Sequence, residues 1–303
     1  MKVAYIVKSI RSAGLEMIEQ ANEIIEEYLA QGYTLTLRQI YYQFVARGLL
    51  ANEQREYNRL GNLVNDGRML GLIDWNAIED RTRRLEGLTH WDSPRQILNA
   101  VAGQFRYDKW KNQPWRIEVW IEKEALAGVF EAVCNELDIP FLSCRGYGSQ
   151  SVMWRAAMRL RGYETRDGQR TLILHFGDHD PSGMDMTRDI EDRLFTFGSR
   201  VQVKRIALNM DQVEEYDPPP NPAKLSDTRA TEYIRKFGDE SWELDALNPA
   251  TLSDLVREEV AQKLDQTLWD KNVGEEEEVK RGLRHIADNW ESILGGKGGF
   301  FDW

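Results

Sequence analysis

Three acidic residues stand at the ends of strand-like segments, where a fold can gather carboxylates for chemistry. Glu122 closes the segment IEVWIE, and Asp178 and Asp180 close TLILHFGDHD. Asp178 and Asp180 are separated by one residue, so in an extended chain their side chains point the same way and can share a cation. Ligand sets made only of oxygen suit Mg²⁺. The pattern therefore predicts a magnesium site formed by Glu122, Asp178 and Asp180.

Each of these residues also has a plainer interpretation. Asp180 can cap the helix that follows it, and Glu122 can pair with Lys123 or an arginine. We favour the metal site because a Glu at one strand end plus D-x-D-x-x-G at a later one is more specific than D-x-D alone. His175 and His179 flank the acids and are expected to be packing or hydrogen-bonding neighbours. A histidine ligand would shift the preference from Mg²⁺ towards Mn²⁺ or Zn²⁺.

The elements that must position these acids form an alternating pattern from Arg116 onward. Strands are predicted at 116–122, 140–144, 171–178 and 201–208, with helices between them at 124–137, 149–160 and 182–195. Such alternation is typical of a parallel sheet covered by helices on both faces. Function in these sheets collects at the carboxyl ends of the strands. We therefore expect an α/β domain with the three acids at one edge of its sheet.

The N-terminal part instead has the periodicity of helices. Helices are predicted at 14–30, at 37–46 with Thr36 as cap, and at 53–71, followed by a short apolar hairpin or wing at 71–78. Three helices and a wing predict a helix-turn-helix variant, whose later helix usually enters the major groove of DNA. The arginines on and after the third helix fit that role: Arg55, Arg59, Arg68, Arg81, Arg83 and Arg84. An ordinary solvated helix face explains them equally well, because acidic residues interleave with them.

The remaining segments complete a five-part division. Residues 86–115 are predicted to be a connector with one helix from Pro94 to about Phe105. After 210, a break at DPPPNP precedes helices near 225–236, 251–269 and 276–294, and Glu275–Glu278 are taken as a solvated first helical turn. The predicted parts are therefore 1–85 (winged helix), 86–115 (connector), 116–210 (α/β core), 211–294 (its helical C-terminal part) and 295–303 (flexible tail).

Composition limits the class of protein. The 303 residues suffice for about two domains, and a net charge of -11 argues against a general binder of polyanions. Residues 1–116, however, hold 16 Lys and Arg against 14 Asp and Glu, so the acidity belongs to the C-terminal part. Two cysteines make no disulfide framework, and neither a signal peptide nor a membrane span is visible. We expect a cytoplasmic protein with no membrane partner.

Motifs in both halves resemble one known family. Glu122, then R-G-Y-G at 145–148, then D-H-D-P-S-G at 178–183 are similar to the Toprim domain of the topoisomerase VI A-subunit family. That family includes the eukaryotic meiotic double-strand-break transesterase. The segment T-L-R-Q-I-Y-Y at 36–42 resembles the family's motif in a winged-helix domain that precedes Toprim. The resemblance covers residues from about 34 to 210 and implies a winged-helix domain followed by a Toprim domain.

The resemblance assigns roles to individual residues. Tyr42 matches the tyrosine that attacks DNA, Arg38 matches the arginine beside it, and Glu122, Asp178 and Asp180 match the acids that bind Mg²⁺. Tyr41 and Tyr42 point about a quarter-turn apart, so we expect one in the core and the other exposed. Tyr42 lies four residues after Arg38, and the family motif decides the choice. Further predicted contacts with DNA come from Arg38 and from Arg145 of the second motif.

The resemblance also implies partners. In this family two protomers act together, the tyrosine of one facing the acids of the other, so a homodimer on double-stranded DNA is expected. The sequence has no nucleotide-binding loop and no clear N-terminal extension for an ATPase subunit, so it resembles most the stand-alone Mini-A type proteins of mobile elements. No cofactor other than Mg²⁺, with Mn²⁺ as an alternative, is expected. A regulatory or ATPase partner on another chain stays open.

Three functions remain open at this point. The first is Mg²⁺-dependent DNA cleavage by Tyr42, through a covalent phosphotyrosyl intermediate, as in a type IIB topoisomerase A subunit. The second keeps the metal site but uses water as the nucleophile, as a Toprim nuclease does. The third is a winged-helix DNA-binding protein without catalysis. Three acids kept together argue against the third, because like charges in one place need a reason.

Overall fold

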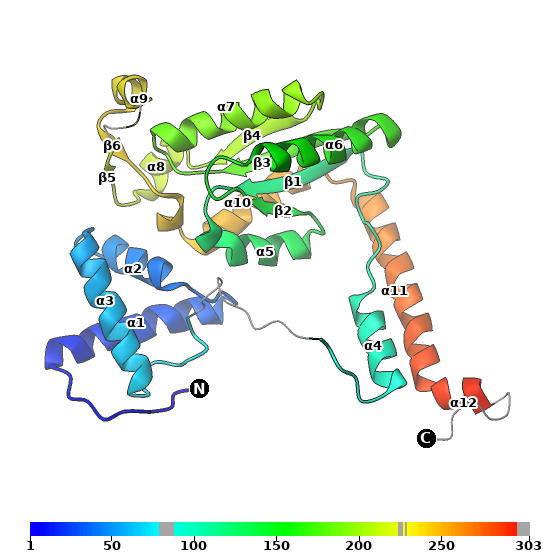
Figure 1. Ribbon diagram of the computed structural model, residues 1–303, viewed down its shortest axis with the longest axis horizontal. Coiled ribbons are helices and arrows are strands. Elements are labelled where there is room, and N and C mark those ends of the chain that lie inside the picture. Colours follow the sequence, from blue (N-terminus) through cyan, green and yellow to red (C-terminus); the bar gives the residue numbers. More distant parts are fainter. Residues whose placement is uncertain (79–87, 224–226, 228, 296–303) are drawn as a thin grey trace. The chain divides into compact units, whose positions relative to one another are not determined.

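The computed structural model describes residues 1–78, 88–223, 227 and 229–295 (Figure 1). The chain divides into two compact units. The first contains Met1–Arg83 and Ile117–Gln262, and the second contains Arg84–Arg116 and Lys263–Trp303. The second unit is thus built from two segments that lie far apart in the sequence. In the described part of the chain, no helix combines the length and apolar character that crossing a bilayer requires.

The first unit begins with three packed helices, as the periodicity predicts. They are α1 (Ser12–Ala30), α2 (Leu37–Ala46) and α3 (Gln54–Met69). Their apolar faces meet in one core whose fully buried members include Tyr28, Phe44 and Leu60. The Thr36 side chain accepts from the Gln39 backbone N–H while the Gln39 side chain accepts from the Thr36 N–H, a capping box that fixes the start of α2.

The predicted wing after α3 is not a hairpin in the described residues. Leu70 instead forms a single antiparallel bridge with Ala4, and Ile78 forms a single parallel bridge with Leu35. The backbone groups at 70 and 78 therefore pair with other segments of the unit rather than with each other. The three predicted helices are present, whereas Arg81, Arg83 and Arg84 lie outside the described residues.

The second half of the first unit is the expected α/β layer. Its strands β1 (Trp115–Ile121), β2 (Phe141–Ser143), β3 (Arg170–Phe176) and β4 (Gln202–Ala207) form one sheet in the order β2-β1-β3-β4. β1 pairs with β2, and β3 with β4, in parallel, with Val119 opposite Phe141 and Leu172 opposite Gln202. Its helices are η1 (Glu124–Leu126), α5 (Ala127–Glu136), α6 (Gln150–Arg166) and α7 (Pro181–Thr196), and Figure 1 shows α5 on one face and α6 and α7 on the other.

The chain after β4 returns to the N-terminal helices. It forms α8 (Met210–Tyr216), β5 (Asn221–Pro222), α9 (Ala230–Phe237), β6 (Glu240–Ser241), η2 (Leu244–Ala246) and α10 (Pro249–Ala261). The Pro-rich segment is not helical, as predicted, and its last two residues pair with β6. The helix η2 packs against α2, and Ala246 joins the core of α1, α2 and α3. This contact brings a C-terminal segment to the predicted tyrosine.

The second unit corrects the predicted division of the chain. It contains α4 (Pro94–Gln104), α11 (Gln266–Asp288) and α12 (Trp290–Gly295), and α11 packs against α4. Residues 86–115 are therefore more than a connector, and residues 263–294 do not group with the α/β core. The predicted helix 251–269 is wrong at its end: α10 stops at Ala261, and the Asp265 side chain accepts from the backbone N–H groups of Thr267 and Leu268 to start α11.

The interpretation of Glu275–Glu278 as a solvated first turn is also wrong. These residues lie in the middle of α11, and Glu276 is buried. Its carboxylate accepts from Lys109 Nζ at 2.8 Å and from Lys280 Nζ at 2.6 Å. Two ammonium groups thus compensate the burial of one carboxylate, which single-helix periodicity cannot reveal.

Candidate functional site

Arg38 and Tyr42 occupy one face of α2, as their four-residue spacing predicts. Arg38 Nη2 donates to the Tyr42 hydroxyl oxygen at 3.3 Å, and the guanidinium lies 5.6 Å from the centre of the Tyr42 ring. The expectation that one of the two tyrosines is exposed is wrong, because both are buried. The Tyr41 hydroxyl donates to backbone carbonyls of the segment between α2 and α3, those of Ala51 and Glu53. The Tyr41 hydroxyl is thus bound to the backbone, whereas the Tyr42 hydroxyl is bound to Arg38.

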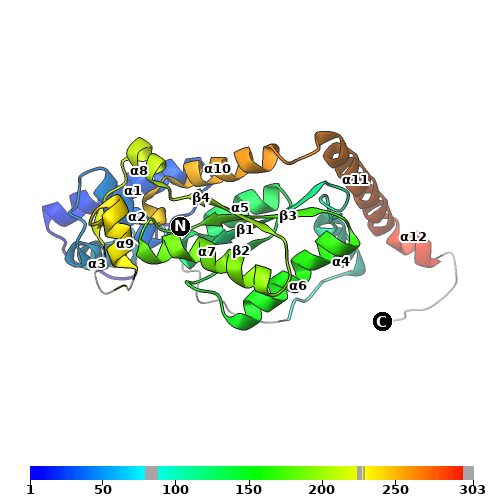
Figure 2. The same cartoon turned by 90° about the horizontal axis from the view of Figure 1, so that it is seen from above.

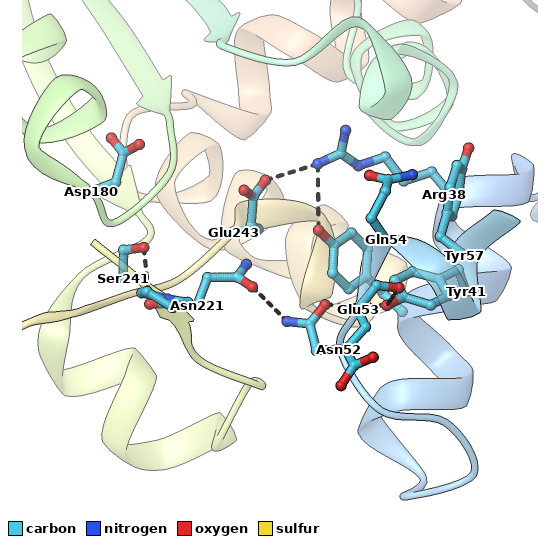
Figure 3. A pocket seen from close by; sticks show the side chains of 12 residues that line it. Arg38, Tyr41, Asn52, Glu53, Gln54, Tyr57, Asp180, Asn221, Ser241 and Glu243 are labelled. Carbon is cyan, nitrogen blue, oxygen red and sulfur yellow. Dashed lines mark hydrogen bonds and ion pairs between the residues drawn. The ribbon is translucent and has the colours of Figure 1, made fainter. Parts of the chain in front are cut away.

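Tyr42 borders a cavity of about 360 Å³ in the first unit (Figure 3). The lining comes from α2, from the start of α3 and from the β5–β6 segment: Arg38, Tyr41, Tyr42, Asn52, Glu53, Gln54, Tyr57, Asp180, Asn221, Pro222, Ser241 and Glu243. A second cavity of about 330 Å³ is lined by Glu122, Lys123, Arg145 and Asp245, among others, and Arg38 lines both cavities. Arg38 is therefore the side chain shared by the tyrosine and the acidic strand ends.

The three predicted acids lie together at the carboxyl ends of β1 and β3. Glu122 Oε2 accepts from the Asp178 backbone N–H at 3.0 Å, and Asp180 Oδ1 accepts from the Gly183 N–H at 2.6 Å as the cap of α7. A Cβ atom at Gly183 would stand 2.3 Å from the Asp178 carbonyl oxygen and 3.0 Å from Glu122 Oε2. Only glycine fits there, which explains its place in the D-x-D-x-x-G pattern.

Burial and neighbouring charges change the proton affinity of Glu122 and Asp178. Burial, and then the neighbouring Asp178 and Asp180 carboxylates, raise the pKa of Glu122 to about 7. Burial raises the pKa of Asp178 as well, although Lys123 opposes that shift. A carboxyl group that titrates near neutral pH is typical of functional sites.

Lys123 supplies the positive charge at these acids. Its Nζ lies 3.0 Å from Asp178 Oδ2 and 3.1 Å from Asp245 Oδ1, and it also pairs with Glu243. The second oxygen of Asp178 accepts from the Leu244 N–H at 2.8 Å. Both oxygens of Asp178 are therefore engaged by the protein itself.

This arrangement does not fit the predicted Mg²⁺ site. An ammonium group occupies the position at Asp178 where a cation would bind, and Asp180 caps a helix. Among the residues that the structure describes, no three His, Cys, Asp or Glu side chains are grouped as ligands of one metal ion.

Sequence patterns missed two acids of this site, Glu243 and Asp245. Arg38 Nη2 lies 3.1 Å from Glu243 Oε2, and Arg38 Nε lies 3.0 Å from Asp245 Oδ2. The sequence feature that could have identified them is the alternation of apolar and acidic residues in W-E-L-D-A at 242–246, which places acids beside buried positions. Asp245 thus lies between two cations, Arg38 from α2 and Lys123 from the end of β1.

The two histidines are structural neighbours, as expected. His175 Nδ1 lies 2.8 Å from Thr187 Oγ1, and His179 Nδ1 lies 2.7 Å from the Tyr233 hydroxyl. Burial lowers the pKa of His175 to about 3 and that of His179 to about 4. Both rings are therefore neutral at physiological pH.

The predicted DNA-binding arginines on α3 differ in what they contact. Arg55 and Arg59 line a groove of about 720 Å³ along α3, together with Lys8 and Arg11 of the preceding segment. Arg68 instead turns towards the protein and donates to the carbonyl oxygens of Trp75 and Ile78, at 2.6 and 3.0 Å.

Arg145 lies at the acidic site rather than on α3. It donates to both carboxylate oxygens of Glu124, at 2.8 and 2.9 Å, and lines the cavity that Glu122 and Arg38 share. Its positive charge therefore lies at the cavity that borders the acidic residues at the carboxyl ends of the strands.

Comparison with known proteins adds no relative. No known protein family has a model that matches this chain, and no curated protein sequence matches it significantly. The function is therefore inferred from the geometry of the site itself.

Proposed function

We propose that this protein cleaves double-stranded DNA by transesterification, with Tyr42 as the nucleophile. The observation that carries the proposal is the Arg38–Tyr42 pair at a cavity that also borders acidic strand ends. A phenol beside a guanidinium suits attack on a phosphodiester, because the guanidinium can stabilise the charge that develops on the phosphate oxygens. The basic groove along α3 offers a separate surface for the DNA backbone.

The reaction balances as a simple exchange of esters. The Tyr42 oxygen forms a bond to phosphorus while the bond from phosphorus to a deoxyribose oxygen breaks, and the departing sugar oxygen takes up a proton. Burial, followed by the Asp245 charge, raises the pKa of Tyr42, whereas Arg38 lowers it. The phenol must therefore lose its proton during attack. Asp180, which lines the same cavity, is a carboxylate suited to accept it.

We infer in addition that the first unit combines a winged-helix domain with a Toprim core. The parallel α/β sheet is compatible with a Toprim core, and the three N-terminal helices are compatible with a winged-helix domain. Action as a homodimer of the type IIB topoisomerase A-subunit kind, in the cytoplasm, is part of the same proposal. A requirement for Mg²⁺ stays a prediction from the sequence.

The test compares wild type with Tyr42→Phe on supercoiled plasmid, with and without Mg²⁺, and with and without protease before electrophoresis. Tyr57→Phe is the matched control, because Tyr57 lines the same cavity and the change removes the same atom. We expect wild type and Tyr57→Phe to give DNA ends that carry protein until protease is added. Tyr42→Phe should lose at least about 99% of this product, since no other group replaces a missing nucleophile. Cleavage unchanged in Tyr42→Phe would overturn the proposal.

One observation favours a second function, hydrolysis by water. With a pKa of about 7, Glu122 can accept a proton from water near neutral pH. Hydrolysis would leave DNA ends free of protein, would be lost in Glu122→Gln, and would be indifferent to Tyr42→Phe. The same gel distinguishes the two functions.

A further inference from the structure

Arg38 already holds anions in the position where the proposed reaction needs a phosphate. Its Nη2 contacts Glu243 at 3.1 Å, and its Nε contacts Asp245 at 3.0 Å (Figure 3 shows the Glu243 contact). A guanidinium binds carboxylate and phosphate oxygens through the same N–H groups. A phosphodiester that approaches Arg38 must therefore compete with these carboxylates.

The two carboxylates differ in how easily they can be displaced. The Asp245 side chain is 0% exposed, whereas the Glu243 side chain is 24% exposed and lines the cavity beside Tyr42. Removing the buried Asp245 from its cations would leave an uncompensated charge in the interior, which is costly. Glu243 is therefore the carboxylate that an incoming phosphate meets and can replace.

Lys123 gives Glu243 a second partner. The Lys123 ammonium pairs with Glu243 as well as with Asp178 and Asp245. Glu243 can leave Arg38 without becoming an unpaired charge, because it stays bound to Lys123. Exchange of Glu243 for a phosphate on Arg38 thus needs only a local movement of one side chain.

We propose that Glu243 is an internal mimic of the DNA phosphate: in the resting protein it occupies the anion position on Arg38 that a phosphodiester takes before attack by Tyr42. The inference rests on the proposed function and deepens it, since it defines the anion position of the same site. Glu243 is a positioning residue here, because it acts through Arg38 and contributes no atom to the reaction. It also makes DNA binding at the site conditional on an exchange of anions.

The experiment measures binding of a short fluorescent duplex by anisotropy, with Tyr42→Phe as the common background so that binding is observed apart from cleavage by Tyr42. Glu243→Gln removes the competing charge and should tighten binding about fivefold, in line with other single charge changes at polar interfaces. Glu240→Gln is the matched control, because it removes the same charge from the exposed position three residues earlier in the same segment. It should change binding less than twofold.

A double-mutant cycle shows whether the gain acts through Arg38. In an Arg38→Gln background, Glu243→Gln should give no gain beyond that of Glu240→Gln, because no guanidinium is left to release. Glu243→Asp keeps the charge but shortens the reach, so it should give an intermediate gain even if Glu243→Gln folds poorly. Equal gains from Glu243→Gln and Glu240→Gln, the same gain in both backgrounds, or weaker binding would each overturn the inference. A Tyr42→Phe protein that still cleaves would refute the proposed function and leave this binding result intact.

Discussion

Glu122 shows how neighbouring charges set the chemistry of a single residue. Its carboxyl lies against the Asp178 backbone and near two other acids, and its pKa is raised to about 7. A folded-state pKa above the ordinary value means that the fold favours the protonated form. The fold therefore loses stability relative to the unfolded chain as pH rises from the ordinary pKa of glutamate to about 7, and the loss stays constant above that.

Glu122→Gln should remove this pH dependence. We expect the variant and wild type to have similar melting temperatures near pH 4, and the variant to become more stable than wild type by a few degrees as pH rises to about 8. Calorimetry across this range measures the difference. Glu131→Gln, at an exposed position on α5, is the control and should show no such trend. A difference that does not change with pH would show that Glu122 does not carry the raised pKa.

Individual residues of the site were predictable where local rules apply. Arg38 and Tyr42 share a helix face, and Glu122 and Asp178 follow strands of one sheet, so spacing and strand order suffice. The ion pairs of Lys123 with Glu243 and Asp245 were not predictable. They join residues more than a hundred positions apart, a separation that no local pattern of spacing can bridge.

Among the elements, α3 carries the side chains that the proposed contact with DNA would use. Arg55, Asn58, Arg59 and Asn62 recur at helical spacing along its groove, and arginine and asparagine are the side chains that pair best with guanine and adenine edges. Lys8 and Arg11 add positive charge from the neighbouring segment, although Lys8 bonds Asp66 and Arg59 pairs with Glu56. A major-groove role for this face stays a prediction from the sequence.

Replacing Arg55 and Arg59 together by alanine should weaken binding of a DNA duplex about tenfold at moderate salt. The slope of log affinity against log salt should also fall by about 2, because about one counterion fewer is released for each lost charge. Anisotropy titrations over a range of salt concentrations measure both effects. The matched control replaces Arg155 and Arg161, two exposed arginines of α6, by alanine. Equal losses in the two variants would refute a specific role for α3.

The bounds of most elements followed from the sequence because caps and periodicity are local. The capping box at Thr36 and the glycines at 32 and 48, whose φ values are +84° and +68°, mark the ends of helices. The wing and the break before α11 did not follow. The wing depends on which distant backbone the segment pairs with, as the bridges from Leu70 to Ala4 and from Ile78 to Leu35 show. The break before α11 comes with the cap at Asp265, which helical periodicity alone did not reveal.

At the scale of the whole chain, the second unit is held by a charge cluster that composition could not reveal. Burial opposes ionisation of Glu276, yet hydrogen bonds from Lys109, Lys280 and the Tyr107 backbone lower its pKa to about 2. A carboxyl group whose pKa is lower in the folded state than in the unfolded chain stabilises the fold at pH values above the ordinary pKa of glutamate. That stability is lost as pH falls through about 2.

Glu276→Gln should therefore destabilise the protein at neutral pH by about 3 kcal/mol, a typical cost for breaking a buried ion pair. The difference from wild type should shrink as pH falls from about 4.5 towards 2. Urea unfolding at several pH values measures it. Glu278→Gln, an exposed neighbour on the same helix, should cost little at any pH. A difference as large at acidic pH as at neutral pH would show that the charge of Glu276 is not what stabilises this unit.

The net charge of -11 is unevenly distributed, since residues 1–116 hold 16 Lys and Arg against 14 Asp and Glu and the acidity belongs to the rest of the chain. The α/β class and the helical N-terminus followed from the sequence. The grouping of 84–116 with 263–303 did not, because it depends on the contact of α4 with α11.

In the proposed reaction, Tyr42 becomes covalently bound to DNA. The most direct measurement denatures the protein during incubation with DNA, digests it with trypsin and nuclease, and maps the attached nucleotide by mass spectrometry. The account predicts a nucleotide phosphate on the peptide that contains Tyr42, and none on that peptide in Tyr42→Phe. A nucleotide on another residue, or cut DNA with no peptide attached, would contradict it.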